Sequence, residues 1–143
     1  MVLRMEHVGI VVEEMAPAIE FFLALGLELQ AQWSAEDEWV GRVIGLDGVR
    51  AEAAMLGAPG GSGAVELVSF HSPPSPAGDP GAPSNAPGIR HLSFAVEDLD
   101  ATLARCGAEP VGAIERYEDS WRLCYVRGPG GILIELAEPL GSG

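Results

Sequence analysis

Residues 7–22, HVGIVVEEMAPAIEFF, are matched by a second stretch at residues 91–106, HLSFAVEDLDATLARC. Both stretches open with histidine, continue through five mostly apolar residues that end in valine, and then give two acidic residues. Both go on with apolar residues at the spacing of an amphipathic helix. Each half of the chain also ends in an apolar segment that carries one glutamate, VELV at 65–68 and IELA at 134–137. The simplest explanation is an internal duplication, with one structural module in each half.

Each half is predicted to fold as a strand, a helix and three further strands, which makes the fold class α+β. The first helix is expected at 15–25 and ends at Gly26, whereas the second is expected at 99–106 with Asp98 as its N-cap. Residues 38–46 could form a helical turn. The expected strands cover residues 6–12, 27–33, 49–56 and 64–70 in the first half, and 90–96, 110–117, 121–127 and 132–137 in the second.

The segment 71–88, HSPPSPAGDPGAPSNAPG, separates the two halves. Its density of proline, glycine and serine is typical of a connector and excludes a helix or a central strand. We therefore expect a first βαβββ module at 1–70, this connector, and a second βαβββ module at 89–140. Neither module is large enough for much of a core, so the two repeats are expected to pair into one domain.

The chain has 143 residues and a formal net charge of −13. A nucleic-acid-binding protein needs a basic surface, so this charge argues against that class and against binding to an anionic membrane. No apolar run approaches the roughly 20 residues that span a bilayer, and acidic residues come too early for a secretory signal. The two cysteines do not make a disulfide framework, so we expect a cytoplasmic protein with free thiols.

Each half contributes one histidine at its first strand and one glutamate at its last, His7 with Glu66 and His91 with Glu135. Because strand side chains alternate between faces, each histidine is expected on the face opposite the helix, among small residues. Each glutamate alternates with apolar neighbours and is aimed at the same face. A lone histidine at a strand start is more often structural, and a lone glutamate usually faces solvent. Recurrence of the pair in both halves favours a shared role.

Two imidazoles and two carboxylates suit one divalent first-row ion such as Zn²⁺, Ni²⁺, Co²⁺, Mn²⁺ or Fe²⁺. The ion would also offset the cost of placing two carboxylates among apolar residues. The predicted metal ligands are therefore His7, Glu66, His91 and Glu135. Four protein ligands leave room for water in a five- or six-coordinate shell.

The segments HVGIVV, AIEFF, LGLEL and VEL of the first half, with GIRHLSFAVEDLDATLAR and GPGGILIELAE of the second, resemble the vicinal oxygen chelate superfamily. This superfamily includes glyoxalase, methylmalonyl-CoA epimerase, extradiol dioxygenases and bleomycin-binding proteins. The resemblance implies paired βαβββ modules whose open, cup-shaped mixed sheets surround one metal, with the helices outside. It places the metal ligands on His7, Glu66, His91 and Glu135. The complete set is most similar to the glyoxalase or methylmalonyl-CoA epimerase branch.

The leading functional hypothesis is a metal-dependent lyase or isomerase that chelates two vicinal oxygens of a small-molecule substrate. A proton would be transferred through an enediolate-like intermediate, with Glu135 or Glu66 as the base. The resemblance also implies a homodimer, and the ligands of one ion could come from one chain or from two. One of the arginines could hold an anionic group of the substrate; the candidates are Arg42, Arg90, Arg122 and Arg127.

Two other classes of function remain open. One is a non-haem Fe(II) dioxygenase that uses a histidine and a glutamate of the set and leaves positions for dioxygen. The other is a metal-free protein that sequesters a small molecule, as in antibiotic resistance, for which the acidic charge suits a cationic ligand. Oxygen uptake dependent on ferrous iron would indicate the first, and a protein without stoichiometric metal would indicate the second.

Overall fold

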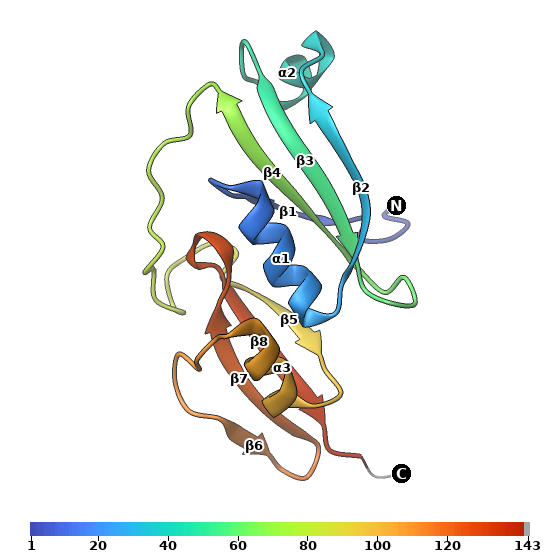
Figure 1. Cartoon of the computed structure of the whole chain (residues 1–143), viewed down its shortest axis with the longest axis vertical. Coiled ribbons are helices and arrows are strands. Elements are labelled where there is room, and N and C mark those ends of the chain that lie inside the picture. The colour runs from blue at the N-terminus through green and yellow to red at the C-terminus, as the bar shows by residue number, and fades with distance from the viewer. Residues whose placement is uncertain (142–143) are drawn as a thin grey trace. The chain divides into compact units, whose positions relative to one another are not determined.

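The computed structural model describes residues 1–141, which form eight strands, three α-helices and one short 3-10 turn. The chain divides into two compact units, Met1–Gly78 and Asp79–Gly143. Each unit contains one open four-stranded mixed sheet (Figure 1). The α+β fold predicted from the repeat is therefore confirmed. Within residues 1–141, no helix is both long enough and apolar enough to cross a membrane.

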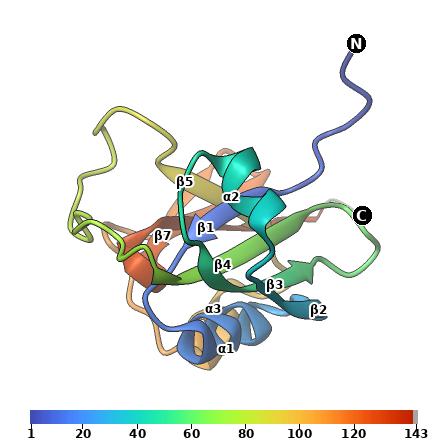
Figure 2. The ribbon, with the colours of Figure 1, turned by 90° about the horizontal axis from the view of Figure 1, so that it is seen from above.

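The first unit contains β1 (Val8–Val11), α1 (Met15–Leu25), β2 (Glu28–Ala35), α2 (Glu38–Ile44), β3 (Arg50–Gly57) and β4 (Ala64–Ser72). Its strands lie in the order β1-β4-β3-β2. The first strand pairs in parallel with β4, and the other neighbours are antiparallel. Helix α1 packs on β3 and β4, and Figure 2 shows α1 and α2 on opposite sides of this sheet.

The second unit contains β5 (His91–Ala95), α3 (Leu99–Cys106), β6 (Glu115–Tyr117), β7 (Trp121–Arg127) and β8 (Leu133–Pro139). Its strands lie in the order β5-β8-β7-β6, with β5 parallel to β8 and the other pairs antiparallel. Helix α3 contacts β8. The second sheet thus repeats the strand order and pairing of the first, as the internal duplication predicts.

Helix α1 buries an apolar stripe against the first sheet. The stripe recurs at helical spacing and consists of Met15, Ala18, Ile19, Phe22 and Leu25. Phe22 is fully buried, as are Leu56 of β3 and Leu67 of β4 on the sheet face that α1 covers. The helix ends where Gly26 adopts a left-handed conformation with φ 108°, the conformation for which glycine is favoured. This glycine cap, like the bounds of α1, agrees with the prediction.

Most predicted strand boundaries differ from the observed ones by at most two residues, and two of the differences matter for the fold. The strand expected at 110–117 is confined to β6, because Pro110 lacks an N–H and Gly112 has no side chain to pack. Ahead of β6, the N–H of Val111 donates to the carbonyl oxygen of Tyr125 in β7 at 2.7 Å. The strand expected to end at residue 70 runs to Ser72 and takes in His71, so the irregular connector begins later than expected. The helical turn considered for 38–46 is present as α2.

Arg127 fixes the later part of the connector within the second unit. Its Nη1 donates to the carbonyl oxygens of Pro80, Ala82 and Gly131, at 3.3, 2.9 and 3.0 Å. A Cβ atom at Gly131 would overlap the backbone of Pro80, and φ is +83° at this glycine, so the close approach requires glycine. Arg127 therefore has a structural role through Nη1, and its possible contact with an anionic substrate group stays a prediction.

The 3-10 turn Pro129–Gly131 joins β7 to β8. Gly128 donates its N–H to the carbonyl of Ile132 at 2.7 Å and accepts from the N–H of Gly131 at 3.0 Å. These bonds close the turn and set the pairing in which Val126 lies opposite Ile134 and Tyr125 lies opposite Glu135.

Asp98 caps the N-terminus of α3: its carboxylate accepts a hydrogen bond from the N–H of Ala101 at 3.0 Å, as predicted. The helix is also tied to β7 by an ion pair. Two nitrogens of Arg122 donate to the two carboxylate oxygens of Asp100 at 2.9 and 3.0 Å. Arg122 thus binds α3 on the sheet face opposite Glu135, and its possible contact with a substrate stays a prediction.

We expect this ion pair to stabilise the second unit only while Asp100 is ionised. The hydrogen bonds from Arg122 hold the pKa of Asp100 below its usual value, which is about 3.9. The stabilisation is therefore fully present above about pH 3.9 and is lost as the pH falls through the lower pKa of the folded state. Urea unfolding of the wild type and of Asp100→Asn should differ at neutral pH and converge in acid. A difference that grows towards acid pH would contradict this assignment.

Candidate metal centre

The first unit brings His7 and Glu66 together. His7 directly precedes β1, and Gly9 of β1 is the register partner of Glu66 in β4. His7 lies two residues before Gly9 and points to the same face of the sheet as Glu66. Two long side chains at this offset on neighbouring strands can reach each other. The Nε2 atom of His7 lies 4.0 Å from Oε2 of Glu66, and the side chains are 35% and 25% exposed.

The second unit repeats this arrangement with His91 and Glu135. Ser93 of β5 is the register partner of Glu135 in β8, so His91 again lies two residues before the partner of the glutamate. The Nε2 atom of His91 lies 3.6 Å from Oε1 of Glu135, and the side chains are 39% and 21% exposed. Each predicted histidine thus meets the glutamate of its own half, at the same register in both sheets.

The sheet faces alternate as the sequence predicted. Ile10 and Val12 are buried beside α1, whereas Gly9 and Val11, on the face of His7, are exposed. Val65 and Leu67, which flank Glu66, are buried on the other face. The flanks of Glu135, Ile134 and Leu136, are fully buried as well. The glutamates are only partly buried, so the cost of placing them there is lower than the apolar sequence around them suggested.

Tyr125 belongs to the second pair, and sequence reasoning missed it. It is the register partner of Glu135 across β7 and β8, so it lies on the same face. Its hydroxyl lies 3.3 Å from Nδ1 of His91, and the two rings are 4.9 Å apart between centroids with a tilt of 38°. The position opposite Glu66 in the first unit is occupied by Met55. The sequence places a tyrosine on a strand beside the glutamate strand, but this alone does not reveal its contact with His91.

The donor atoms in each pair are too far apart for a good hydrogen bond, and their separation lies near that of two ligands of one ion. Ligands about 2.1 Å from a first-row ion lie roughly 3.0–3.4 Å from each other in octahedral or tetrahedral geometry. The separations of 3.6 and 4.0 Å are slightly wider than this range. Neither unit gathers three or more His, Cys, Asp or Glu side chains as a metal cluster among the residues that the structure describes. Each unit alone therefore offers two donors.

The third histidine forms a similar pair that does not belong to this site. Nε2 of His71 in β4 lies 3.4 Å from Oε2 of Glu52 in β3, and both side chains are more than half exposed. His71 is an odd number of residues from Glu66, so it points to the opposite face of the same strand. This pair provides a natural control for experiments on the other two.

The two thiols take no part in the pairs. Burial raises the pKa of the Cys124 thiol, although the charge of Arg122 opposes the shift. Burial likewise raises the pKa of the Cys106 thiol, against the charge of Arg105. A thiol with a raised pKa is a poor nucleophile and a poor metal ligand at neutral pH. Free, unreactive thiols agree with the sequence prediction.

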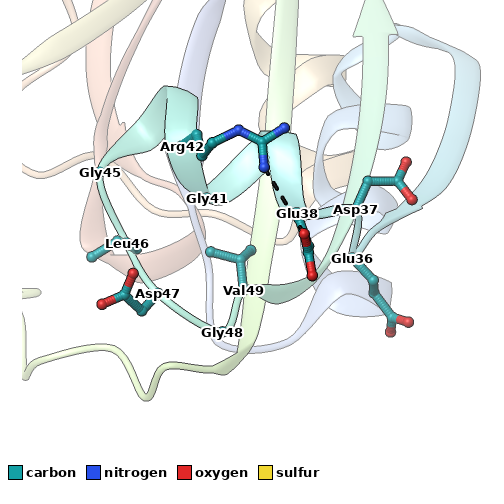
Figure 3. A pocket seen from close by; sticks show the side chains of 10 residues that line it. All are labelled: Glu36, Asp37, Glu38, Gly41, Arg42, Gly45, Leu46, Asp47, Gly48 and Val49. Atoms are coloured by element: carbon teal, nitrogen blue, oxygen red, sulfur yellow. Dashed lines mark ion pairs between the residues drawn. The ribbon is translucent and has the colours of Figure 1, made fainter.

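A pocket of about 610 Å³ lies elsewhere in the first unit, around α2 and the loop that follows it (Figure 3). Its charged lining is mostly acidic, from Glu36, Asp37, Glu38 and Asp47. Arg42 lies 4.0 Å from Glu38 and partly offsets this charge. Neither His7 nor Glu66 lines the pocket. The pocket is therefore separate from the histidine–glutamate pair of the first unit.

The sequence model of the Glyoxalase/Bleomycin resistance protein/Dioxygenase superfamily matches residues 4–136. The chain belongs to this superfamily, which confirms the resemblance drawn from its repeats. Its two open mixed sheets agree with that membership.

Several proteins are similar to this chain over nearly its whole length. A glyoxalase family protein from Bacillus cereus is 47% identical, with a TM-score of 0.94 and coverage of 99% of this chain and 97% of that one. The uncharacterized protein YaeR of Escherichia coli (strain K12) is 28% identical over 142 residues, or 94% of this chain and 95% of that protein. Trypanothione-dependent glyoxalase I from Leishmania major is 20% identical, with a TM-score of 0.65 and coverage of 96% and 87%. The last likeness shows the fold alone.

Proposed function

We propose that this protein is a metal-dependent lyase or isomerase of the glyoxalase type that acts on a small-molecule substrate. The observation that carries the proposal is the recurrence of one histidine–glutamate pair at the same register in two sheets of the same topology. Duplication accounts for the copying of the pair, and the same register in both sheets supports a shared role of the two pairs. Membership of a superfamily named for glyoxalases and dioxygenases supports this reading.

The proposed ligands are His7, Glu66, His91 and Glu135. Their imidazole nitrogens and carboxylate oxygens are the donors that divalent first-row ions accept. One ion held by all four requires a pair from each unit, supplied by one chain or by two chains of a homodimer. When bound, the ion would supply a Lewis acid to two neighbouring oxygens of the substrate.

The glutamates are proposed to move the proton. A carboxylate beside the reacting carbon can accept the proton and return it to a neighbouring position, which completes an isomerisation. In a lyase reaction the carboxylate would instead pass the proton to the group that leaves with the electron pair of the broken bond, so the base is regenerated in both cases. Glu135 and Glu66 are both candidates for the base. Each side chain is partly exposed and lies on an open sheet face. The glutamate that accepts the proton would first detach from the ion, which the histidines and the other glutamate would continue to hold.

Metal analysis of protein purified without chelator is the direct test. We expect about one divalent ion per chain, the content set by four ligands that share one ion. His91→Ala should lower this content sharply, and His71→Ala should leave it unchanged, because His71 pairs with Glu52 on the opposite face. Removal of the ion by a chelator should abolish turnover, and its return should restore it. Wild-type protein with far less than one ion per chain after exposure to each candidate metal would contradict the metal centre.

The same preparation separates the other candidate functions. Activity that depends on ferrous iron and consumes dioxygen would identify a dioxygenase. Tight binding of a cationic small molecule by protein that holds no metal would identify a sequestering protein. An antibiotic binding protein from Streptomyces sp. CB03234 shares the fold at 18% identity and a TM-score of 0.57, with coverage of 97% of this chain and 99% of that one. That likeness supports the sequestering function only through the fold.

A further inference from the structure

We infer that Tyr125 is a positioning residue whose hydroxyl orients the imidazole of His91 for metal binding through Nε2. The inference rests on the proposed metal centre and adds to it a residue that is not one of the four donors. It also makes the two histidine–glutamate pairs unequal, because the first unit carries methionine at the equivalent position.

The geometry comes from three adjacent strands. Strand β8 lies between β5 and β7, and Tyr125, Glu135 and His91 lie on the same face of these strands. Tyr125 and His91 are therefore two strands apart, about 10 Å in the sheet. A tyrosine is long enough to reach across β8, and its hydroxyl ends 3.3 Å from Nδ1 of His91. The backbone of Tyr125 is itself held by the N–H of Val111, which donates to its carbonyl at 2.7 Å.

The two ring nitrogens of His91 then have separate partners. Nδ1 faces the Tyr125 hydroxyl, while Nε2 faces Oε1 of Glu135 at 3.6 Å. A neutral imidazole that binds a metal through Nε2 carries its proton on Nδ1, so the tyrosine oxygen would accept that proton's hydrogen bond. Without a metal, the hydroxyl can instead donate to Nδ1. A hydroxyl can serve in both states because its hydrogen rotates, and the ring keeps the same orientation.

The first unit offers His7 no equivalent partner. Met55 stands opposite Glu66 where Tyr125 stands opposite Glu135. A thioether is at most a weak acceptor and cannot donate. Within residues 1–78, the structure describes no hydrogen bond to Nδ1 of His7. The pair in the second unit is therefore expected to be the better oriented of the two.

Calorimetric titration of metal-free protein with Zn²⁺ tests the role of Tyr125. Tyr125→Phe should raise the dissociation constant about 10- to 100-fold, the usual cost of removing a hydrogen-bond partner from a metal-binding histidine. Tyr117→Phe is the matched control, because Tyr117 lies on the same sheet face but is exposed and lies in β6. It should bind as the wild type does. Equal affinities of Tyr125→Phe and wild type would overturn the inference.

A measurement without metal makes the test independent of binding. The ¹⁵N signal of His91 Nδ1, recorded above the titration range of imidazole and assigned with His91→Gln, should shift in Tyr125→Phe and not in Tyr117→Phe. An unchanged signal would overturn the inference, provided that circular dichroism shows the variant folded. A misfolded Tyr125→Phe would be replaced by Tyr125→Met, which copies the residue of the first unit. Wild-type protein without saturable Zn²⁺ binding contradicts the metal centre itself, whereas wild-type binding with an unchanged variant contradicts only the role of Tyr125.

Discussion

Glu135→Gln is expected to lower kcat by about 10²- to 10⁴-fold, the range that a positioned general base contributes. Glutamine keeps the size of the side chain and one carbonyl oxygen that can still contact a metal. It cannot accept a proton from carbon. Turnover should be measured on thiohemiacetals of α-oxo aldehydes and on CoA thioesters, which cover the two branches that the sequence resembles. Metal content is measured on the same samples, so a loss of the ion is not mistaken for a loss of the base.

Glu52→Gln is the matched control for this experiment. Glu52 also faces a histidine across neighbouring strands, at 3.4 Å, but on the other face of the first sheet. Its replacement should leave turnover and metal content unchanged. Glu66→Gln decides which carboxylate moves the proton, since the variant that keeps its ion and loses kcat identifies the base. Full turnover in both Glu135→Gln and Glu66→Gln would exclude glutamate as the base.

Phe22→Ala is expected to lower the free energy of unfolding by about 3–5 kcal/mol, the usual cost of truncating a fully buried phenylalanine. Phe22 has no exposed surface and sits at the centre of the stripe that α1 lays on the first sheet. It also meets Phe21 edge to face, with ring centroids 5.3 Å apart. A domain of this size has only about 5–15 kcal/mol of stability in total. The variant should therefore lose a large share, measured as the midpoint and slope of urea unfolding.

Leu23→Ala is the control on the same helix. Leu23 is 44% exposed and lies outside the buried stripe, so its truncation should cost roughly 1 kcal/mol or less. Both substitutions leave a good helix former in place, and helix propensity does not separate them. A loss at Phe22 no larger than the loss at Leu23 would mean that α1 does not pack on the sheet as described.

Most of the fold could be predicted because the same order of strand and helix patterns occurs in both halves of the sequence. The bounds of α1 and α3 follow from apolar spacing together with Gly26 and Asp98, which are local signals. The strand expected at 110–117 failed because a short edge strand depends on its neighbour more than on its own residues. There Pro110 and Gly112 outweighed the apolar pattern around them. The continuation of β4 to Ser72 is set by pairing with Arg50 of β3, a distant segment whose reach no local pattern gives.

The pairing of each histidine with a glutamate could also be predicted, because alternation fixes the face and the repeat fixes the partner. The tyrosine could not, since its contact with His91 crosses an intervening strand and depends on which strand lies between them. The tasks of Arg122 and Arg127 were equally hidden. The sequence does not distinguish an arginine that binds Asp100 or the connector carbonyls from an arginine that binds a ligand.

The short 3-10 turn that joins β7 to β8 has a consequence for how this protein can diverge. One added or deleted residue there would shift β8 by a single position and exchange its two sides. Isoleucine or leucine would then stand beside His91, and the carboxylate of Glu135 would be driven beneath α3. Relatives in which this turn is one residue longer or shorter should therefore lack the proposed metal-dependent activity, even where all four donor residues are present.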